Sequence, residues 1–461
     1  MKPLDPQSIA DLLATHDRPG PRYTSYPTAV EFTEDVGSRT YAEHLDAACA
    51  SEAPLSVYAH LPFCRERCAF CGCNVVITKK HGVAVDYLDV LGQEIDLVAD
   101  RLGSRSTVRQ LHWGGGTPTF LTPGEMESLF AKLTSRFTIE PGAEVAIEVD
   151  PRVTTTEQLE VLRRLGFNRV SMGVQDFTPE VQAAITRNQT EAETVTLVDT
   201  CRRLGFQSIN IDLIYGLPLQ TPETFVTNLE KVVRLRPERV AVYSYAHVPW
   251  LKANQRKTDV GFLPTAEVKL RLFGEARRAF VDAGYDPIGM DHFALPNDEL
   301  AVAARTGELH RNFMGYTTHP APDMIGLGVS AIGDVESGYF QNHKILPEYS
   351  RRVLDGELPI QRGVQLTAED RLRRDVIQSI MCNWTVDKRR IEAAHSITFD
   401  DVFAPELREL GGDELRDFVE HDAGAIRVVG VGRLFVRNVA MVFDERLRRM
   451  KKDGPVFSRT V

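Results

Sequence analysis

The chain has no long apolar run. Nowhere in its 461 residues do about 18 consecutive apolar residues occur, the length that a membrane-spanning helix needs. Its first residues, MKPLDPQSIADLLATHD, contain no apolar h-region and carry acidic residues early, so we expect neither a secretory signal nor an organelle address. Basic residues are also in the minority: 54 stand against 64 acidic ones, a formal net charge of −10. This balance argues against nucleic-acid and membrane-surface partners, and we expect a cytoplasmic protein.

Cysteine is scarce, with seven residues in the chain, and it is unevenly distributed: four of the seven fall within ten residues. The crowded four are Cys64, Cys68, Cys71 and Cys73, and the isolated three are Cys49, Cys201 and Cys382. A secreted disulfide framework would spread an even number of cysteines along a short chain. The crowded group therefore favours metal or cluster binding in a reducing compartment.

The remaining composition is that of an ordinary globular enzyme. Hydrophobic residues make up 43% and charged residues 26%, which excludes disordered, collagenous and coiled-coil proteins. At roughly 150 residues per domain, the length allows two or three domains or one large barrel with attachments.

A strand-then-helix pattern recurs between about residue 55 and residue 250. Near-continuous apolar runs predict strands at Leu55–Pro62, Val108–Trp113, Val145–Val149, Arg169–Gln175, Ser208–Tyr215 and Arg239–Tyr245. Helical periodicity predicts helices at Val85–Leu102, Thr155–Leu165, Ala192–Leu204 and Glu223–Leu235. This alternation predicts βαβ units, and so either a TIM-like or a doubly wound sheet.

The strand ends favour the barrel. Polar or glycine residues follow six successive strands, which is where barrel folds build their active sites. We therefore predict an α/β fold, an incomplete (βα)6 TIM-like barrel that is open on one side to admit a large substrate.

Composition shifts divide the rest of the chain. We expect an N-terminal arm at 1–50, with an extended Gly20–Thr28, then the barrel at 51–365 with a loop-rich cover over Gly289–Gly333. For residues 366–461 the sequence pattern predicts a small, mostly helical C-terminal domain that is winged-helix-like. Its expected elements are helices at Ala368–Met381 and Asp413–His421 and a β ribbon at Ile426–Phe435.

The cysteine loop carries the most specific chemistry. Cys64, Cys68 and Cys71 follow a C-x3-C-x2-C spacing, and thiolates select zinc, copper(I) or iron–sulfur clusters. Structural zinc normally uses two separated ligand pairs, and no second pair is present. Three thiolates suit three corners of a cubane with the fourth iron free. A zinc knuckle completed by Cys73 or His60, and free buried thiols, are the alternatives.

The ordered motifs resemble one family, the oxygen-independent coproporphyrinogen III oxidases of the radical S-adenosylmethionine (SAM) superfamily. The similarity runs from Arg22 to the Phe457–Val461 ending. The motifs are Tyr58–Cys64 (YAHLPFC), Cys71–Cys73 (CGC), His112–Pro118 (HWGGGTP), Glu148–Pro151 (EVDP), Ser171–Gln175 (SMGVQ), Asn210–Pro218 (NIDLIYGLP) and Gly289–Ala294 (GMDHFA).

The resemblance implies a chemistry. A [4Fe–4S] cluster on Cys64, Cys68 and Cys71 would reduce SAM bound at the free iron and release a 5′-deoxyadenosyl radical. The radical would convert two propionates of coproporphyrinogen III into vinyl groups, giving protoporphyrinogen IX for haem biosynthesis. The resemblance also implies room for a second SAM molecule. We expect a monomer that receives electrons from a reduced carrier such as flavodoxin or ferredoxin.

The resemblance also assigns site residues. Those expected around SAM and the cluster are Tyr58, Phe70, Gly115, Gly116, Thr117, Glu148, Gln175, Arg187, Asp212, Ala246 and Ile332. Cys73 matches the family as well, and we assign it a catalytic or structural role rather than ligation. Arg22 and Arg311 are candidates by charge for holding propionates.

Three rival functions remain. A related haem chaperone shares the cluster loop, but the Arg22–Pro27 arm and Cys73 favour the oxidase. A DNA-binding regulator is disfavoured by the acidity of the chain. A bare electron carrier would have no use for a free iron, since its clusters take four thiolates.

Overall fold

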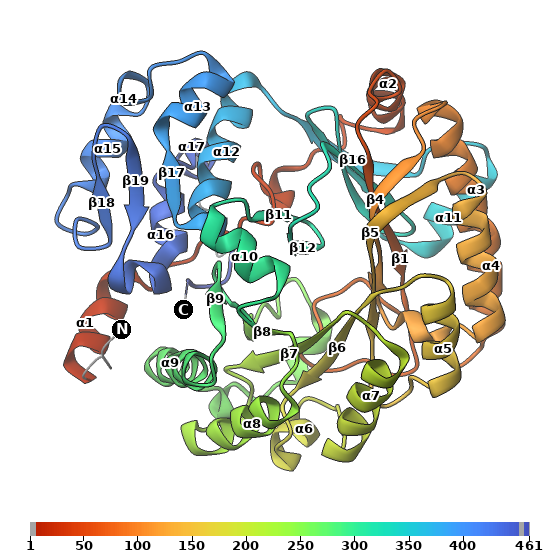
Figure 1. Cartoon of the computed structure of the whole chain (residues 1–461), viewed down its shortest axis with the longest axis horizontal. Helices are drawn as coiled ribbons and strands as arrows, with labels where there is room; N and C mark the ends of the chain where they lie inside the picture. The colour runs from red at the N-terminus through yellow and green to blue at the C-terminus, as the bar shows by residue number, and fades with distance from the viewer. Residues whose placement is uncertain (1–5, 451–455, 461) are drawn as a thin grey trace.

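The computed structural model describes residues 6–450 and 456–460, and Figure 1 shows its arrangement. Within this part of the chain one sheet holds twelve strands in the order β16-β15-β14-β13-β1-β4-β5-β6-β7-β8-β10-β9. All neighbours from β1 to β8 are parallel. They are β1 (Leu55–Leu61), β4 (Thr107–Gly115), β5 (Thr138–Val149), β6 (Arg169–Gln175), β7 (Ser208–Tyr215) and β8 (Arg239–Ser244). The six predicted strands and the incomplete barrel are thus confirmed.

Helices follow these strands and cover the outer face of the sheet (Figure 1). Threonine opens most of them: Thr122, Thr155, Thr190 and Thr221 each accept a hydrogen bond from the backbone N–H three residues later. Each such cap satisfies a free helix N–H and contributes about 1 kcal/mol. The helices are α3 (Gly82–Leu102), α4 (Pro123–Thr134), α5 (Thr156–Arg164), α6 (Pro179–Ala184), α7 (Glu191–Leu204) and α8 (Pro222–Leu235).

The two faces of the barrel differ in polarity. Apolar side chains such as Val57 and Trp113 face the helices in one continuous core. The inner face is polar near the amino ends of the strands, where Gln110 Nε2 donates to Glu144 Oε1 (2.8 Å) and Arg169 pairs with Glu144 (2.8 Å). This polar layer fills the floor of the barrel and leaves the opposite, carboxyl end for ligands.

The Gly289–Gly333 segment is more ordered than the predicted loop-rich cover. It includes β13, which lies parallel to β1 and extends the barrel sheet. Strands of three to five residues carry too little periodicity to be detected in sequence. The added elements are α9 (Ala266–Asp282), β9 (Asp286–Ile288), β10 (His292–Ala294), α10 (Glu299–Thr306), β11 (His310–Asn312), β12 (Gly315–Thr317), β13 (Asp323–Leu327), β14 (Ile332–Val335), β15 (Gly338–Asn342), α11 (Leu346–Leu354) and β16 (Ile360–Gln365).

The C-terminal part has a second hydrophobic core, which also takes in Tyr23 and Tyr26 of the arm. The helix predicted at Asp413–His421 is wrong: after Gly411 and Gly412 the chain makes turns and then enters β18. The predicted β ribbon is correct only in its first part, because Gly430–Phe435 is a 3-10 helix. The elements are α12 (Ala368–Asn383), β17 (Thr385–Asp387), α13 (Lys388–His395), α14 (Phe399–Val402), α15 (Ala404–Leu410), β18 (Val419–His421), β19 (Ala425–Val428), α16 (Val436–Met441) and α17 (Glu445–Arg449).

Residues 20–28 of the N-terminal arm form neither helix nor strand, as predicted, but the arm bends over 24–27 rather than running extended; it lies between α1 (Pro6–His16) and α2 (Ser38–Ala48). Buried Arg437 fixes it: Nε donates to Pro21 O (2.9 Å) and Nη1 to Arg459 O (3.0 Å). Tyr23 adds a hydrogen bond to Asp444 (2.8 Å). The arm therefore joins the barrel to the C-terminal part. Positions 1–5, 451–455 and 461 of the predicted arm and C-terminal domain lie outside the described residues.

No helix in the described ranges is both long enough and apolar enough to cross a membrane.

A buried carboxylate links α3 to the strands added beside β1. Glu94 is 1% exposed and accepts hydrogen bonds from Gly328 N, Tyr349 Oη and Asn342 Nδ2 at 2.6 Å each. Burial raises its pKa from 4.5 to about 7, and these hydrogen bonds limit the rise. The folded state therefore keeps a proton that the unfolded chain releases above about pH 4.5.

We expect the free energy of unfolding to reflect this titration. As pH rises from 4.5 to about 7, this group alone should lower the free energy of unfolding by about 3 kcal/mol. Denaturant unfolding should be measured at several pH values. The free energy of unfolding of Glu94→Gln should decline less steeply with rising pH than that of the unsubstituted protein. The exposed Glu230→Gln on α8 is the control. Equal slopes for all three proteins would contradict the assignment.

Candidate active site

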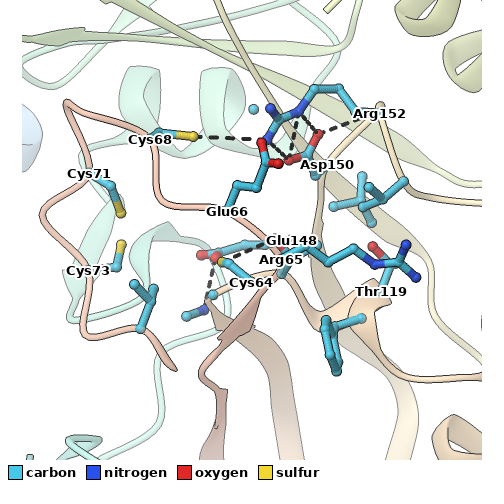
Figure 2. A pocket seen from close by; sticks show the side chains of 18 of the residues that line it. Cys64, Arg65, Glu66, Cys68, Cys71, Cys73, Thr119, Glu148, Asp150 and Arg152 are labelled. Atoms are coloured by element: carbon cyan, nitrogen blue, oxygen red, sulfur yellow. Dashed lines mark hydrogen bonds and ion pairs between the residues drawn. The ribbon is translucent and has the colours of Figure 1, made fainter. Parts of the chain in front are cut away.

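A cavity of about 1010 Å³ opens at the carboxyl ends of the barrel strands (Figure 2). It gathers side chains and turns from the cysteine loop and from the ends of β4, β5, β6 and β7. The predicted site residues that line it are Cys64, Cys68, Phe70, Cys71, Cys73, Gly115, Gly116, Thr117, Glu148, Gln175, Arg187 and Asp212. Most of the predicted site is thus one continuous surface.

The cysteine loop lies between β2 (Phe63–Cys64) and β3 (Val76–Ile77), which pair in parallel. Burial raises the pKa of Cys64 to about 11, and Cys64 Sγ lies 3.5 Å from Thr117 Oγ1. Cys71 and Cys73 face each other in Figure 2, and their hydrogen bond lowers the pKa of Cys71 to about 6 and raises that of Cys73. Ligand binding at Cys64 must therefore displace a firmly held proton.

Cys68 has a cationic environment. Arg187 Nη1 lies 3.7 Å and Arg152 Nη2 3.9 Å from its sulfur. Asp150 holds both arginines, at 3.2 Å from Arg187 and 2.7 Å from Arg152. Two guanidinium groups that share one carboxylate therefore border this sulfur.

Asn254 fixes the cysteine loop, and sequence reasoning missed it. Its Nδ2 lies within hydrogen-bond distance of the carbonyl oxygens of Cys68 (3.3 Å), Ala69 (3.0 Å) and Cys71 (3.0 Å). The next residue, Gln255, donates to Phe70 O (3.0 Å) and Ala246 O (3.1 Å). Both lie in the 3-10 helix Ala253–Lys257, far from the loop in sequence, so no local signal could have found them.

Two carboxylates face the cavity. Glu148 accepts from Gly115 N (3.0 Å) and lies 3.4 Å from His112 Nε2; burial opposes its ionisation, but these contacts outweigh burial and hold its pKa below the usual range. Burial and the charge of Glu148 raise the pKa of Asp212 to about 6. Together the two provide acceptors for hydroxyl or ammonium groups of a ligand.

Glycines bring backbone close to the cavity. A Cβ on Gly116 would lie 2.5 Å from the carbonyl carbon of Pro62, and Gly115 has a φ of 114°. A Cβ on Gly173 would lie 2.6 Å from Gln175 Nε2. Side chains at these positions would displace the cysteine strand or the amide, so the glycines are required by close approach.

Comparison with known proteins identifies the family. A model of the radical SAM superfamily matches residues 58–232. The oxygen-independent coproporphyrinogen III oxidase of Escherichia coli (strain K12) is 46% identical over 98% of each chain. The chain belongs to the oxygen-independent coproporphyrinogen III oxidase family. The oxidase of Pseudomonas aeruginosa is 43% identical, again over 98% of each chain. A solved structure of the E. coli coproporphyrinogen III oxidase, described as a radical SAM enzyme, matches with a TM-score of 0.89 over 92% of this chain and 97% of that one.

The residues present fit the cofactors of this oxidase family, a [4Fe–4S] cluster and SAM. Three cysteines on the C-x3-C-x2-C spacing line one cavity, and Arg187 Nη1 lies 3.7 Å from the sulfur of Cys68. The side chain of Glu148 is 43% exposed, and the buried Nε of Arg187 has no hydrogen-bond partner among the described residues. Soft donors, free acceptors and an unpaired donor are what a cluster with a charged nucleotide requires.

Three predicted oxidase site residues do not line the cavity. Tyr58 packs beside it, with its hydroxyl 2.9 Å from His60 Nδ1 and its ring stacked on His112. Gln255 donates to the carbonyl oxygens of both Ala246 and Phe70, and Ile332 packs against a hydrophobic cluster that includes Phe32 and Tyr339. The roles of these three and of the lining residues stay predictions.

The two candidate propionate ligands are already engaged. Arg22 pairs with Asp291 and lies over the ring of Tyr243, which lines the cavity. Buried Arg311 donates to Arg22 O (2.9 Å) and lies over Tyr316. Both therefore join the arm to the barrel mouth.

Proposed function

We propose that this chain catalyses the anaerobic oxidative decarboxylation of two propionates of coproporphyrinogen III, giving protoporphyrinogen IX for haem biosynthesis. Each propionate loses one hydrogen atom from its β-carbon, then carbon dioxide and one electron, and becomes a vinyl group. The observation that carries the proposal is the C-x3-C-x2-C loop on a cavity at the strand ends, in a chain similar to these oxidases along nearly its whole length.

The residues have distinct proposed tasks. Cys64, Cys68 and Cys71 hold the cluster, which with SAM supplies the 5′-deoxyadenosyl radical that removes the hydrogen atom. Gly115, Gly116 and Thr117 line the methionine end of SAM, while Glu148 and Asp212 accept hydrogen bonds from its ribose hydroxyls or its ammonium group. Gln175 and Arg187 provide donors, with Arg187 facing the SAM carboxylate. Tyr58, Phe70, Ala246 and Ile332 offer backbone or apolar contacts around the adenine and the cluster. We also propose that a second SAM molecule binds near the first, and that Cys73 has a catalytic or structural role and does not bind the cluster.

Anaerobic reconstitution tests this function. The protein is loaded with iron and sulfide and incubated with SAM, a reductant and coproporphyrinogen III. We expect 5′-deoxyadenosine together with mono- and divinyl products. A preparation that holds zinc, or that cleaves SAM without forming vinyl product, would contradict the proposal. Haem transfer without porphyrinogen oxidation would favour the chaperone instead.

We also propose a reduced carrier such as flavodoxin or ferredoxin as the electron donor. Exposed Arg65, Arg67, Lys79 and Lys80 surround the cysteine loop of an otherwise acidic chain, which suits an acidic carrier protein.

Charge reversal should separate protein from chemical reduction. Lys79→Glu/Lys80→Glu should raise the KM for an acidic carrier about tenfold and leave dithionite-driven turnover unchanged. The control is Arg389→Glu/Arg390→Glu, a basic pair exposed on α13. Equal KM values in all three proteins would refute this donor surface.

The remaining proposals concern organisation. We propose a cytoplasmic monomer; the four crowded thiols need a reducing compartment. Cell fractionation and sedimentation test these points; a membrane fraction or a dimer would contradict them.

Residues 366–461 form the proposed winged-helix-like domain beside the 51–365 barrel and the 1–50 arm. Their separate core supports this division, and limited proteolysis that fails to cut near 366 would oppose it.

A further inference from the structure

A row of paired residues continues the inner face of the sheet beyond β1. Tyr58 lies opposite Gly326 on β13, and a Cβ on Gly326 would be 2.5 Å from the carbonyl carbon of Ile332 on β14. Ile332 in turn lies opposite Gln341 on β15, and Gln341 opposite Arg362 on β16. Residues directly opposite each other on neighbouring strands point to the same face. Arg362 therefore shares the inner face with Tyr58.

Arg362 is positioned but not neutralised. Its Nε donates to Gln341 Oε1 (2.8 Å), and its guanidinium lies 5.7 Å from the centre of the Phe32 ring. Among the described residues no carboxylate forms an ion pair with it; Glu34 acts only as a more distant charge. Burial lowers its pKa. A side chain held at one nitrogen keeps the two outer nitrogens of its fork for a ligand.

Two lysines, Lys344 and Lys252, add positive charge near this guanidinium. Burial, then the positive charges of Arg362 and Lys252, lower the pKa of Lys344. Lys344 O accepts from Asn74 Nδ2 (3.0 Å), and Asn74 comes one residue after Cys73. Lys252 lies two residues before Asn254, whose Nδ2 donates to Cys71 O (3.0 Å), so the segments that carry Lys252 and Lys344 both contact the cysteine loop.

Mutually repelling cations without a carboxylate partner cost free energy unless an anion joins them. We propose that Arg362, Lys344 and Lys252 form a subsite that binds a propionate carboxylate of the tetrapyrrole. This inference rests on the proposed function, which supplies a substrate with four propionates. A fixed cation stabilises a carboxylate against loss as neutral carbon dioxide, so the subsite holds a propionate that is not reacting.

Steady-state kinetics of the reconstituted enzyme test the subsite. Arg362→Gln should raise the KM for coproporphyrinogen III about 10- to 100-fold, with little change in kcat or in SAM affinity. Arg362→Lys should recover part of the loss. The KM of the unsubstituted enzyme should rise with salt, and that of Arg362→Gln should rise less. Arg39→Gln, at an arginine 93% exposed on α2, is the matched control.

Each outcome decides a different point. If the unsubstituted enzyme forms no vinyl product, the proposed function fails. If it turns over but Arg362→Gln keeps a normal KM, only the subsite is wrong. If Arg362→Gln instead lowers the affinity for SAM, the row of residues that ends at Arg362 would serve the nucleotide, and the inference would be overturned. If Arg362→Gln does not fold, Lys344→Gln, in the loop after β15, applies the same test, and an unchanged KM there would refute the subsite.

Discussion

Cys68→Ser is expected to abolish 5′-deoxyadenosine formation in the reconstituted protein. Serine offers a hard, protonated oxygen where a soft thiolate is needed. It also removes the sulfur that lies 3.9 Å from Arg152 and 3.7 Å from Arg187. The loss should exceed the roughly 10- to 100-fold that removal of an outer-shell partner causes at metal sites. Iron and sulfide content, together with chromatography of the nucleoside, measure it.

Two cysteine variants give this prediction its controls. Cys49→Ser replaces a partly buried cysteine at the end of α2 and should retain both cluster and activity. Cys73→Ser should retain the cluster whatever its effect on turnover, because the assigned ligands are Cys64, Cys68 and Cys71. Full activity of Cys68→Ser, or loss of iron from Cys73→Ser alone, would refute this ligand set.

The sequence predicted the barrel well because its signals are local. Each of the six strands is a short apolar run that ends in polar or glycine residues, and the predicted bounds of β6 and β7 match the structure. The cysteine spacing likewise needs only ten residues to be read. Since parallel strands bring their carboxyl ends to one edge, these local signals located the site, whereas the resemblance to the oxidase family supplied most of its individual residues.

What the sequence could not predict depends on contacts between distant segments. β13 is five residues long, yet it lies beside β1, which precedes it by more than 250 residues. Asn254 lies in a short 3-10 helix, and its role is visible only because its amide contacts three carbonyl oxygens of the cysteine loop. The row that ends at Arg362 exists only through strand pairing. Side-chain periodicity within one segment carries no information on such pairings.

Gly116→Ala is the second substitution for which we expect a large effect. Gly116 N donates to Leu61 O (2.9 Å) and Thr117 N to Phe63 O (2.9 Å), so this turn holds the strand that carries Cys64. A Cβ would lie 2.5 Å from Pro62 C and 2.8 Å from Phe63 N, both backbone atoms that cannot rotate away. Overpacking of this kind costs about 1–3 kcal/mol. A shift of the reacting groups by about 1 Å can lower the rate about 100-fold.

Gly124→Ala provides the comparison that isolates the close approach from glycine content. A Cβ at Gly124 meets nothing within 4 Å, and its backbone is helical in the first turn of α4. Alanine there should stabilise the protein by about 0.5–1 kcal/mol and leave SAM cleavage unchanged. Denaturant unfolding and 5′-deoxyadenosine formation, measured on both variants, separate stability from activity. If Gly116→Ala cleaved SAM as fast as Gly124→Ala, the strand bearing Cys64 would tolerate displacement, and tight placement of that ligand would not be needed for the chemistry.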